Sequence, residues 1–482
     1  MNDLRLVPAA LSVWVSTFVM LRTGQWWCAA AVVAIGVCLC ALWDKMQAGV
    51  VGLGGFCALV CVGIKINVLQ RSGLAHQLPP TMMVRAQSRP FQTDSGWIIE
   101  ARFAHSPGSI PIFYRGAHIS QSSCLYPGAP FVVSGKAVAT DKAVLLKHMY
   151  IASDIRCVEQ TEPTIWEKYV QLMQGIKDNF LSAVGHYIDD DAIAGLYAAM
   201  VMGDTSLQSE YDKQIYAATG LAHLSAVSGG NVAIITTTVM LLLGLCGCSP
   251  RICAVGGLVS LILFALFIGY EPSVIRASAT GAVSMVAALS ITRAPPIHTL
   301  SLSVIGIVVW DSDMASNYGF LLSVSATAGI IVLNPIFYRV CANIPWWHIP
   351  DVVNRTAAVA LAAEMATIPV IAVMNHTLSL VSFFANVLVA AVVAPITVLG
   401  LLAIVLSNCG FFSGVAYIPI ALCQPLVRWI YCVAERGSQL PYAHISLSQG
   451  WVGVAWSVLL VAWVISLALF YGSRKKRPEE RS

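Results

Sequence analysis

Apolar runs of about 18 or more residues recur along most of this chain, and a run of that length is typical of a helix that crosses a membrane. The 482 residues are 57% hydrophobic and only 11% charged, and their mean hydropathy is +0.74. In soluble domains roughly a quarter of the residues are charged. The sequence therefore predicts a polytopic α-helical membrane protein, with a net charge of +4 that is too small to indicate a nucleic-acid partner by itself.

Twelve apolar segments are predicted as membrane helices, three before a long polar region and nine after it. They are residues 6–21, 26–43, 48–69, 223–245, 252–270, 273–291, 297–310, 318–338, 355–374, 379–406, 412–434 and 450–471. The segment 379–406 is long and contains Pro395. Because proline disturbs a helix interior, this segment is predicted as a kinked span, a re-entrant segment or two half-spans.

Basic residues orient the predicted helices. The tail Arg474–Arg477 indicates a cytoplasmic C-terminus, because lysine and arginine are enriched in cytoplasmic loops. With twelve spans the N-terminus is then also cytoplasmic, and residues 71–190 lie outside. Arg251, Arg293, Arg339 and Arg355 fall in predicted inside loops, whereas Arg22 does not. We expect a multi-pass protein of the cell membrane that contacts lipid.

The polar region is predicted to hold a small extracytoplasmic β-barrel, residues 71–160. Runs rich in β-branched and aromatic residues predict strands at 96–104, 110–115, 130–139 and 143–152. About five short strands suit a small barrel, for which an oligonucleotide-binding (OB) type and an SH3-like type both stay open. Residues 161–190 form a linker with an amphipathic helix at Thr164–Val184. That helix is expected either on the membrane surface or packed against the barrel.

The stretch Gly220–Ile235 combines small and polar residues at the start of an apolar segment. His223, Ser228 and Asn231 all lie in it. Such side chains are costly in hydrocarbon unless they find protein or water partners, so the stretch is predicted to line a pore or cavity, or to form a helix contact.

Of the fourteen cysteines, Cys124 and Cys157 are the pair in the polar region. Outside the membrane a disulfide between them is expected, with a pair of free thiols as the alternative. Cys246 and Cys248 form a Cys-x-Cys pair without a second ligand pair nearby, which is a poor metal signal. We predict no metal and no cofactor.

Five motifs occur in order along the chain. They are Met202–Tyr211, Gly220–Ile235, Gly269–Ala277 with a Pro-Ser-x-x-Arg-Ala pattern, Asn317–Ser325 with Gly-Phe-x-Leu-Ser, and Leu380–Leu388 with Ala-Asn followed by Pro395. Together they resemble the ComEC family of competence DNA-uptake channels. The resemblance covers residues 90–435. It implies an OB-like external domain, a channel domain at 191–472 and a cytoplasmic tail at 473–482, after three N-terminal helices in residues 1–70.

The resemblance implies passage of single-stranded DNA across the cytoplasmic membrane from outside to inside, with no catalytic residues. A separate DNA receptor outside and a separate ATPase or translocase inside are expected, since the chain has no phosphate-binding Gly-x-x-x-x-Gly-Lys-Ser/Thr loop. Self-association of the chain is left open. The chain also has no His-x-His-x-Asp-His run, the mark of the metallo-β-lactamase-like domain that many members add. We therefore expect no nuclease activity here, unless a separate nuclease supplies it.

Two residues depart from the family pattern. Asn231 stands where many relatives carry a Leu-His pair after the glycine, and Glu364 stands where a polar uncharged residue is more usual. For Glu364 we expect either a neutral carboxyl group or a pair with Arg276 or His223.

Candidate DNA contacts follow from what single-strand binders use, a basic groove with aromatic stacking platforms. In the barrel they are Trp97, Arg102, Phe113, Tyr114, Arg115 and Lys136; along the membrane path they are His223, Ser228, Asn231, Arg276, Glu364 and Asn386. Each of these is also compatible with a structural role, which is the favoured interpretation for the barrel residues and for Glu364. Arg276 in particular is predicted to meet phosphate, to pair with Glu271 or to reach the membrane surface, and Asn386 is assigned to helix packing.

Two other functions remain compatible with the sequence. A transporter of small solutes would also have twelve spans with interrupted polar helices. An intramembrane enzyme would use His223, Ser228 or Glu364.

Overall fold

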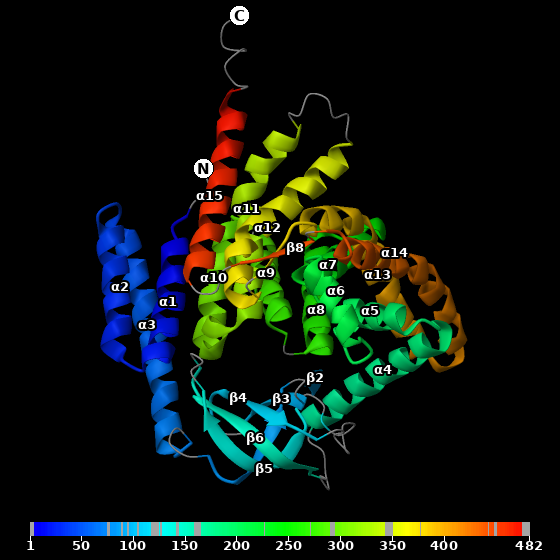
Figure 1. Ribbon diagram of the computed structural model, residues 1–482, viewed down its shortest axis with the longest axis horizontal. Coiled ribbons are helices and arrows are strands. Elements are labelled where there is room, and N and C mark those ends of the chain that lie inside the picture. The colour runs from blue at the N-terminus through cyan, green and yellow to red at the C-terminus, as the bar shows by residue number, and fades with distance from the viewer. Residues whose placement is uncertain are drawn as a thin grey trace, which may run out of the picture. The chain divides into compact units, whose positions relative to one another are not determined.

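The computed structural model describes residues 4–474 except 75–77, 88–89, 94–95, 104–105, 117–124, 126–127, 141–143, 159–164, 226, 270, 290–294, 343–349, 376, 442 and 448–450. The chain divides into two compact units, whose helices and strands are labelled in Figure 1. Unit 1 consists of Met1–Asp178 and Ala254–Asn317, and unit 2 consists of Asn179–Cys253 and Tyr318–Ser482.

Unit 1 contains two groups of helices and a β domain. Its helices are α1 (Val7–Thr23), α2 (Trp26–Ala41), α3 (Lys45–Arg71), most of α8 (Pro250–Ile268), α9 (Pro272–Leu289) and α10 (Pro296–Trp310), which is followed by the short 3-10 helix η3 (Ser312–Ser316). Local sequence sets their ends. The carboxylate of Asp44 accepts a hydrogen bond from the backbone N–H of Met46 at 2.8 Å and so caps α3. Gly24 ends α1 in the left-handed conformation.

The β domain (residues 78–157) is a six-stranded sheet. Its strands are β1 (Thr81–Ala86), β2 (Phe91–Thr93), β3 (Gly96–Arg102), β4 (Ser109–Tyr114), β5 (Pro130–Ala139) and β6 (His148–Cys157). The strand order is β1-β5-β6-β4-β3-β2, and β1 also pairs with β3. The pairings β1–β5–β6–β4–β3–β1 therefore return to their starting strand. The β4–β6 pairing is parallel, and the other described pairings in this sheet are antiparallel.

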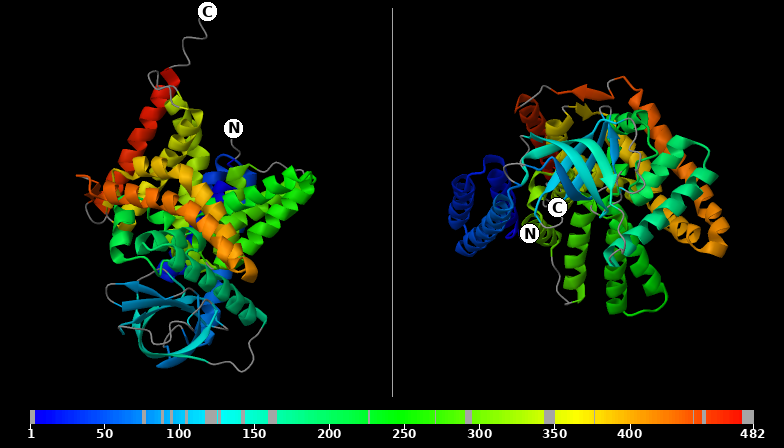
Figure 2. Two further views of the ribbon diagram at one scale, coloured as in Figure 1. Left: turned by 90° about the vertical axis from the view of Figure 1, so that its right-hand side faces the viewer. Right: turned by 90° about the horizontal axis from the view of Figure 1, so that it is seen from below.

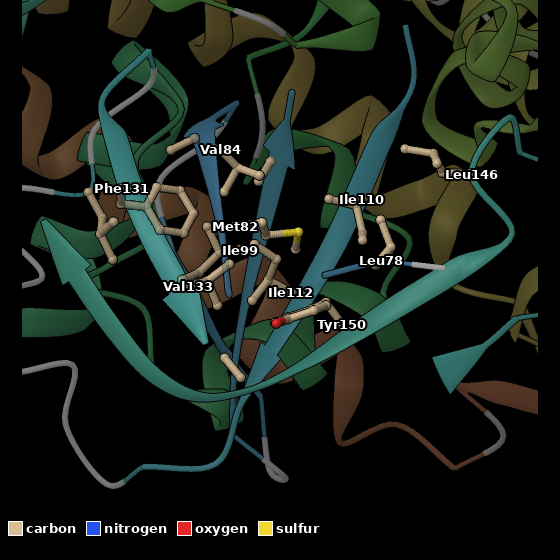
Figure 3. Packing of buried hydrophobic residues seen from close by; sticks show 14 of the residues in the cluster. Leu78, Met82, Val84, Ile99, Ile110, Ile112, Phe131, Val133, Leu146 and Tyr150 are labelled. Carbon is tan, nitrogen blue, oxygen red and sulfur yellow. The ribbon is translucent and has the colours of Figure 1, made fainter. Parts of the chain in front are cut away.

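Alternate residues of these strands form one apolar core, which the strands surround (Figures 2 and 3). Ile99 and Ala101 of β3, Ile110 and Ile112 of β4 and Tyr150 of β6 are all fully buried. The period of two is what a strand with one buried face requires. Leu69 of α3 also belongs to this core, so a helix of unit 1 and the β domain share side-chain packing.

Three of the four predicted strands lie within two residues of the observed β3, β4 and β5. The fourth predicted strand, 143–152, has the wrong bounds, because β6 begins at His148 and ends at Cys157. The apolar pair Leu145 and Leu146 misled the prediction. Leu146 is 1% exposed and fills the core from a bend that precedes the strand, so an apolar run here marks a buried loop.

The amphipathic helix predicted at Thr164–Val184 is α4 (Ile165–Tyr187), which runs from unit 1 into unit 2. Its buried residues include Lys177, whose ammonium group donates to the carbonyl oxygen of Ile268 at the end of α8, 3.2 Å away. Ile165 and Leu172 remain exposed. One face of α4 thus packs against other parts of the protein, while the apolar side chains of Ile165 and Leu172 are exposed at its surface.

Unit 2 is helical apart from one short strand pair. Its helices are α5 (Asp191–Met202), α6 (Glu210–Ala218), the 3-10 turn η2 (Ala222–Leu224), α7 (Gly229–Leu245), α11 (Tyr318–Ala342), α12 (Asp351–Asn375), α13 (Ser382–Ser407), the 3-10 helix η4 (Gly410–Ala416), α14 (Tyr417–Ser438) and α15 (Trp451–Arg474), and the strands are β7 (Thr377–Ser379) and β8 (His444–Ser446). The segment predicted at 379–406 forms one continuous helix, α13, with Pro395 inside it. Helix α5 was not predicted; ten of its twelve residues are buried.

Each of the twelve predicted membrane segments contains a helix, and seven helices of the described chain are long and apolar enough to cross a membrane. These seven are α3, α8, α11, α12, α13, the helix at Gly414–Ser438 and the one at Val452–Phe470. The other predicted segments are α1, α2, α7 and α10, with 15–17 residues, and α9, with 18 residues. The protein is a multi-pass membrane protein. The twelve-span topology stays a prediction.

Candidate functional site

Asn231 joins three helices of unit 2. It lies in the first turn of α7 and is 4% exposed. Its amide nitrogen donates to the carbonyl oxygen of Met200 in α5 at 2.9 Å. Its amide oxygen accepts from the hydroxyls of Ser228, at 3.3 Å, and of Thr397 in α13, at 3.4 Å. The polar start of α7 is therefore a helix contact, one of the roles that its sequence left open.

Gly220, at the other end of the same stretch, packs directly against the start of α13. Its φ of +69° lies in the left-handed region, and a Cβ placed on it would overlap the side chain of Ser382. Beside it, the hydroxyl of Ser379 donates to the carbonyl oxygen of Ala218 at 2.7 Å. Only glycine fits this position without strain, so the turn after α6 and the beginning of α13 form one tight contact.

Glu364 of α12 lies near that contact, and its carboxyl group interacts with the Ser382 hydroxyl. Its Oε2 atom is buried without a hydrogen-bond partner in the described part of the chain. Neither predicted cationic partner, Arg276 or His223, pairs with it among the described ion pairs. A carboxyl group in this setting is desolvated and satisfied on one oxygen only.

The other three path candidates differ in exposure. His223 lies in η2 with an exposed side chain, and its Nδ1 atom is 3.1 Å from the carbonyl oxygen of Gly220. Asn386 donates to the carbonyl oxygen of Ser382, one turn earlier in α13, at 3.0 Å. Arg276, in unit 1, is only 7% exposed and lies in the first half of α9. Its role as a phosphate contact stays a prediction.

The aromatic candidates of the β domain lie on β3 and β4. Trp97 is the cross-strand partner of Tyr114, and both are partly buried against the core. Phe113 faces the opposite side of β4, with the Arg115 guanidinium 5.9 Å from the centre of its ring. Arg115 and Lys136 are exposed. Exposed cations beside an aromatic ring are the groups that a single nucleic-acid strand can use.

Arg102 is already bound to protein. Its guanidinium forms an ion pair with the carboxylate of Asp311 at 2.6 Å, and Asp311 is 6% exposed. Positions 97 and 102 have opposite parity on β3, so Arg102 lies on the face opposite the core side on which Trp97 packs. The sequence analysis did not place Asp311 in a site.

Asp313 and Lys65 complete a charged network beside this pair. The Asp313 carboxylate accepts hydrogen bonds from the backbone N–H groups of Leu145, at 2.8 Å, and Ser109, at 3.2 Å. Burial raises the pKa of Asp313, and the bond from Leu145 opposes that rise. The ammonium group of Lys65 donates to the carbonyl oxygens of Val309 and Trp310, the last carbonyls of α10, at 2.9 and 2.8 Å.

Cys157, at the end of β6, is disulfide-bonded. Its predicted partner, Cys124, lies outside the described residues, so that pairing stays a prediction. The twelve other cysteines are free. No group of three or more histidine, cysteine or acidic side chains able to hold a metal occurs in the residues that the structure describes.

Comparison with known proteins places the chain in a family. ComE operon protein 3 of Bacillus subtilis (strain 168) is 23% identical over 216 residues, which are 45% of this chain and 26% of that protein. This chain therefore matches well under half of the relative's length. No solved structure gives a significant match. A family model for the competence protein matches residues 200–474, more than half of the chain, and confirms the resemblance carried by the ordered motifs. The chain belongs to the competence protein family.

Proposed function

We propose that this protein forms the path by which single-stranded DNA crosses the cytoplasmic membrane, from outside to inside, during natural transformation. The observation that carries the proposal is the match of residues 200–474 to the competence protein family, together with the β domain at residues 78–157. The path itself performs no chemistry. Separate proteins would deliver the DNA outside, pull it inside and degrade the other strand.

The β domain would receive the strand as an OB-like barrel. Its ring of pairings, with a parallel step between β4 and β6, supports a five-stranded closed barrel of this type. OB folds bind oligonucleotides on their second and third strands, which correspond here to β3 and β4. Phe113 and Arg115 on that face would stack on bases and neutralise phosphate, respectively. Lys136 on β5 adds an exposed positive charge.

In the membrane we propose Arg276 and His223 as groups that meet the passing strand, each in its own unit. The basic side chains suit a polyanion. Asn231, Asn386 and Ser228 would instead hold the helices around the path, as their hydrogen bonds indicate. Both termini would lie in the cytoplasm and residues 71–190 outside, where a Cys157–Cys124 disulfide is stable.

The proposal is tested by uptake of labelled DNA in cells that lack this gene and then carry it again as wild type or as Arg276→Ala. We expect the deletion to leave DNA binding at the cell surface intact and to stop strands from reaching the cytoplasm. Arg276→Ala should import less DNA than Arg251→Ala, a matched control at the exposed start of α8. If cells without the gene import DNA normally, the proposal is wrong.

A binding measurement tests the β domain within the full-length protein. The affinity of the detergent-purified protein for an oligothymidine strand should fall steeply with salt, and Arg115→Ala should reduce the slope of log K against log salt by about 0.7. Arg156→Ala is the control, because that exposed arginine pairs with Asp154. Equal slopes for the two variants would contradict the assignment of Arg115.

A further inference from the structure

We infer that Asp311 and Asp313 clamp the β domain onto the helices of unit 1, so that its DNA-binding strands are held in one orientation. The clamp is inferred from the hydrogen bonds and the ion pair that these two residues form. Its consequence for DNA import rests on the proposed function. Arg102 is on this view a positioning residue rather than a DNA contact.

The first part of the clamp is Asp313. Its carboxylate lies in η3, directly after α10, is half-buried, and accepts two backbone N–H groups of the β domain, from Ser109 at the start of β4 and from Leu145 in the bend before β6. It also accepts the Ser109 hydroxyl at 3.4 Å. Hydrogen bonds to a charged acceptor are about twice as strong as neutral ones. One side chain thereby fixes two separate segments of the domain.

The second part is the pair between Asp311 and Arg102. It joins η3 to the end of β3, in a place where Asp311 is almost fully buried. Asp311 also accepts the backbone N–H of Asp313 at 3.2 Å, so the two acids hold each other in position. A charge buried in this way is costly to leave unpaired, and the pair therefore opposes any motion that separates the domain from η3.

Further contacts anchor the supports of the clamp. Lys65 of α3 binds the carbonyl groups at the end of α10 and the hydroxyl of Ser312 at 3.0 Å. Trp14 of α1 donates to the carbonyl oxygen of Ala315 in η3 at 2.8 Å. Leu69 of α3 packs in the core of the β domain. The β domain is thus attached to α3 through its core and to η3 through the ends of its strands β3 and β4. Lys65 of α3 in turn binds the segment that leads into η3, so α3 and η3 are linked to each other.

A domain attached at one point can rotate about its linker, whereas attachment at separate points removes that freedom. The strands β3 and β4 carry the proposed DNA contacts and also carry Arg102 and Ser109 at one end. The residues that would bind the strand and the residues that fix its direction are therefore on the same pair of strands, and their orientation is set by the clamp.

Hydrogen exchange of the full-length protein in detergent tests the clamp without reference to its activity. In Asp313→Asn one of the two carboxylate oxygens becomes an amide nitrogen, which cannot accept a hydrogen bond. At least one of the backbone N–H groups of Ser109 and Leu145 then loses its acceptor, and we expect that amide to exchange about ten-fold faster or more, while amides in the middle of β5 stay as protected as in wild type. Arg102→Gln should also loosen the start of β4. Arg156→Gln, which breaks an exposed pair on β6, is the control.

Unchanged exchange at Ser109 and Leu145 in a folded Asp313→Asn protein overturns the clamp. If Asp313→Asn does not fold, Arg102→Gln carries the same test at Ser109. Faster exchange with normal DNA import by both variants overturns the functional part of the inference. Should wild-type protein itself import no DNA, the proposed function fails, and the exchange result still decides whether the clamp exists.

Discussion

Replacing Gly220 by alanine should destabilise unit 2 more than any other single methyl addition in the stretch Gly220–Ile235. Gly220 has a positive φ of +69°, and the added Cβ would lie 2.6 Å from the Cβ of Ser382 and still closer to its hydroxyl oxygen. Ser382 cannot move away easily, because it is the first residue of α13 and its backbone carbonyl oxygen accepts a hydrogen bond from Asn386.

Two costs add in this variant. A left-handed backbone costs a non-glycine residue about 1–2 kcal/mol. Overfilling a packed contact costs typically about 1–3 kcal/mol. The sum is about 2–5 kcal/mol, which is a large part of the stability of an ordinary domain.

The apparent melting temperature of the detergent-purified protein measures the effect. We expect Gly220→Ala to melt several degrees below wild type and, under the proposed function, to support less DNA import. Gly244→Ala is the matched control, because Gly244 lies inside α7 and a Cβ added there would have no atom within 4 Å. That variant should be neutral or slightly stabilising, since alanine favours a helix interior.

The double variant Gly220→Ala with Ser382→Gly separates the two costs. Removing the Ser382 side chain relieves the overlap but not the backbone strain, so melting should recover in part relative to Gly220→Ala. Ser382→Gly alone sets the baseline. A Gly220→Ala protein that melts and imports DNA as wild type does would refute the packing argument.

Three further changes have defined outcomes. Asn231→Ala leaves the buried Met200 carbonyl without its donor and should cost about 1–3 kcal/mol in a melting experiment, whereas Asn386→Ala, which removes a bond within one helix, should cost clearly less. Burial raises the pKa of Tyr150, and its hydroxyl donates to the carbonyl oxygen of Pro80 at 2.7 Å; the stabilising contribution of the neutral phenol is therefore complete below the unfolded pKa of about 10 and is lost as pH rises through the folded pKa. The melting temperatures of wild type and Tyr150→Phe, measured as the pH is raised, check this. The variant should lack the part of the alkaline loss of stability that Tyr150 causes. Cys157→Ser should destabilise the protein by about 2–4 kcal/mol, and a reducing agent should lower the melting temperature of the wild type but not of the variant.

The helices were predictable because each depends on a local apolar run. Segment 379–406 shows the limit of that signal, since the proline inside it left a kinked span, a re-entrant segment and two half-spans open, whereas α13 is one continuous helix. Helix α5 was missed because its twelve residues are too short for a span and are buried almost all round, which leaves no amphipathic pattern to detect.

The sites were predictable only in part, because their contacts join residues far apart in the chain. Asp313 meets Ser109 across 204 positions and Leu145 across 168. No local pattern pairs an acid with a backbone N–H at such a distance. Asn231 was singled out correctly as a polar residue that needs partners, but the partners, a carbonyl in α5 and a hydroxyl in α13, depend on packing that the sequence does not display.

Two of the motifs that carry the family resemblance, Gly220–Ile235 and Leu380–Leu388 with Pro395, meet at α13. Before Pro395, this helix is held at its start by the turn at Gly220. After Pro395, Thr397 bonds to Asn231, and Gly400 lies so close to Val201 of α5 that a Cβ would overlap that side chain. Proline removes one hydrogen bond of the helix ladder, so the two halves are coupled less stiffly at this point than elsewhere. Each half is instead fixed by its own external contact, and a change at Gly220 acts on the first half while a change at Asn231 acts on the second. Gly220 and Asn231 therefore position α13 within unit 2. This positional role explains why the side chain is absent at one of them and hydrogen-bonded at the other, rather than reactive.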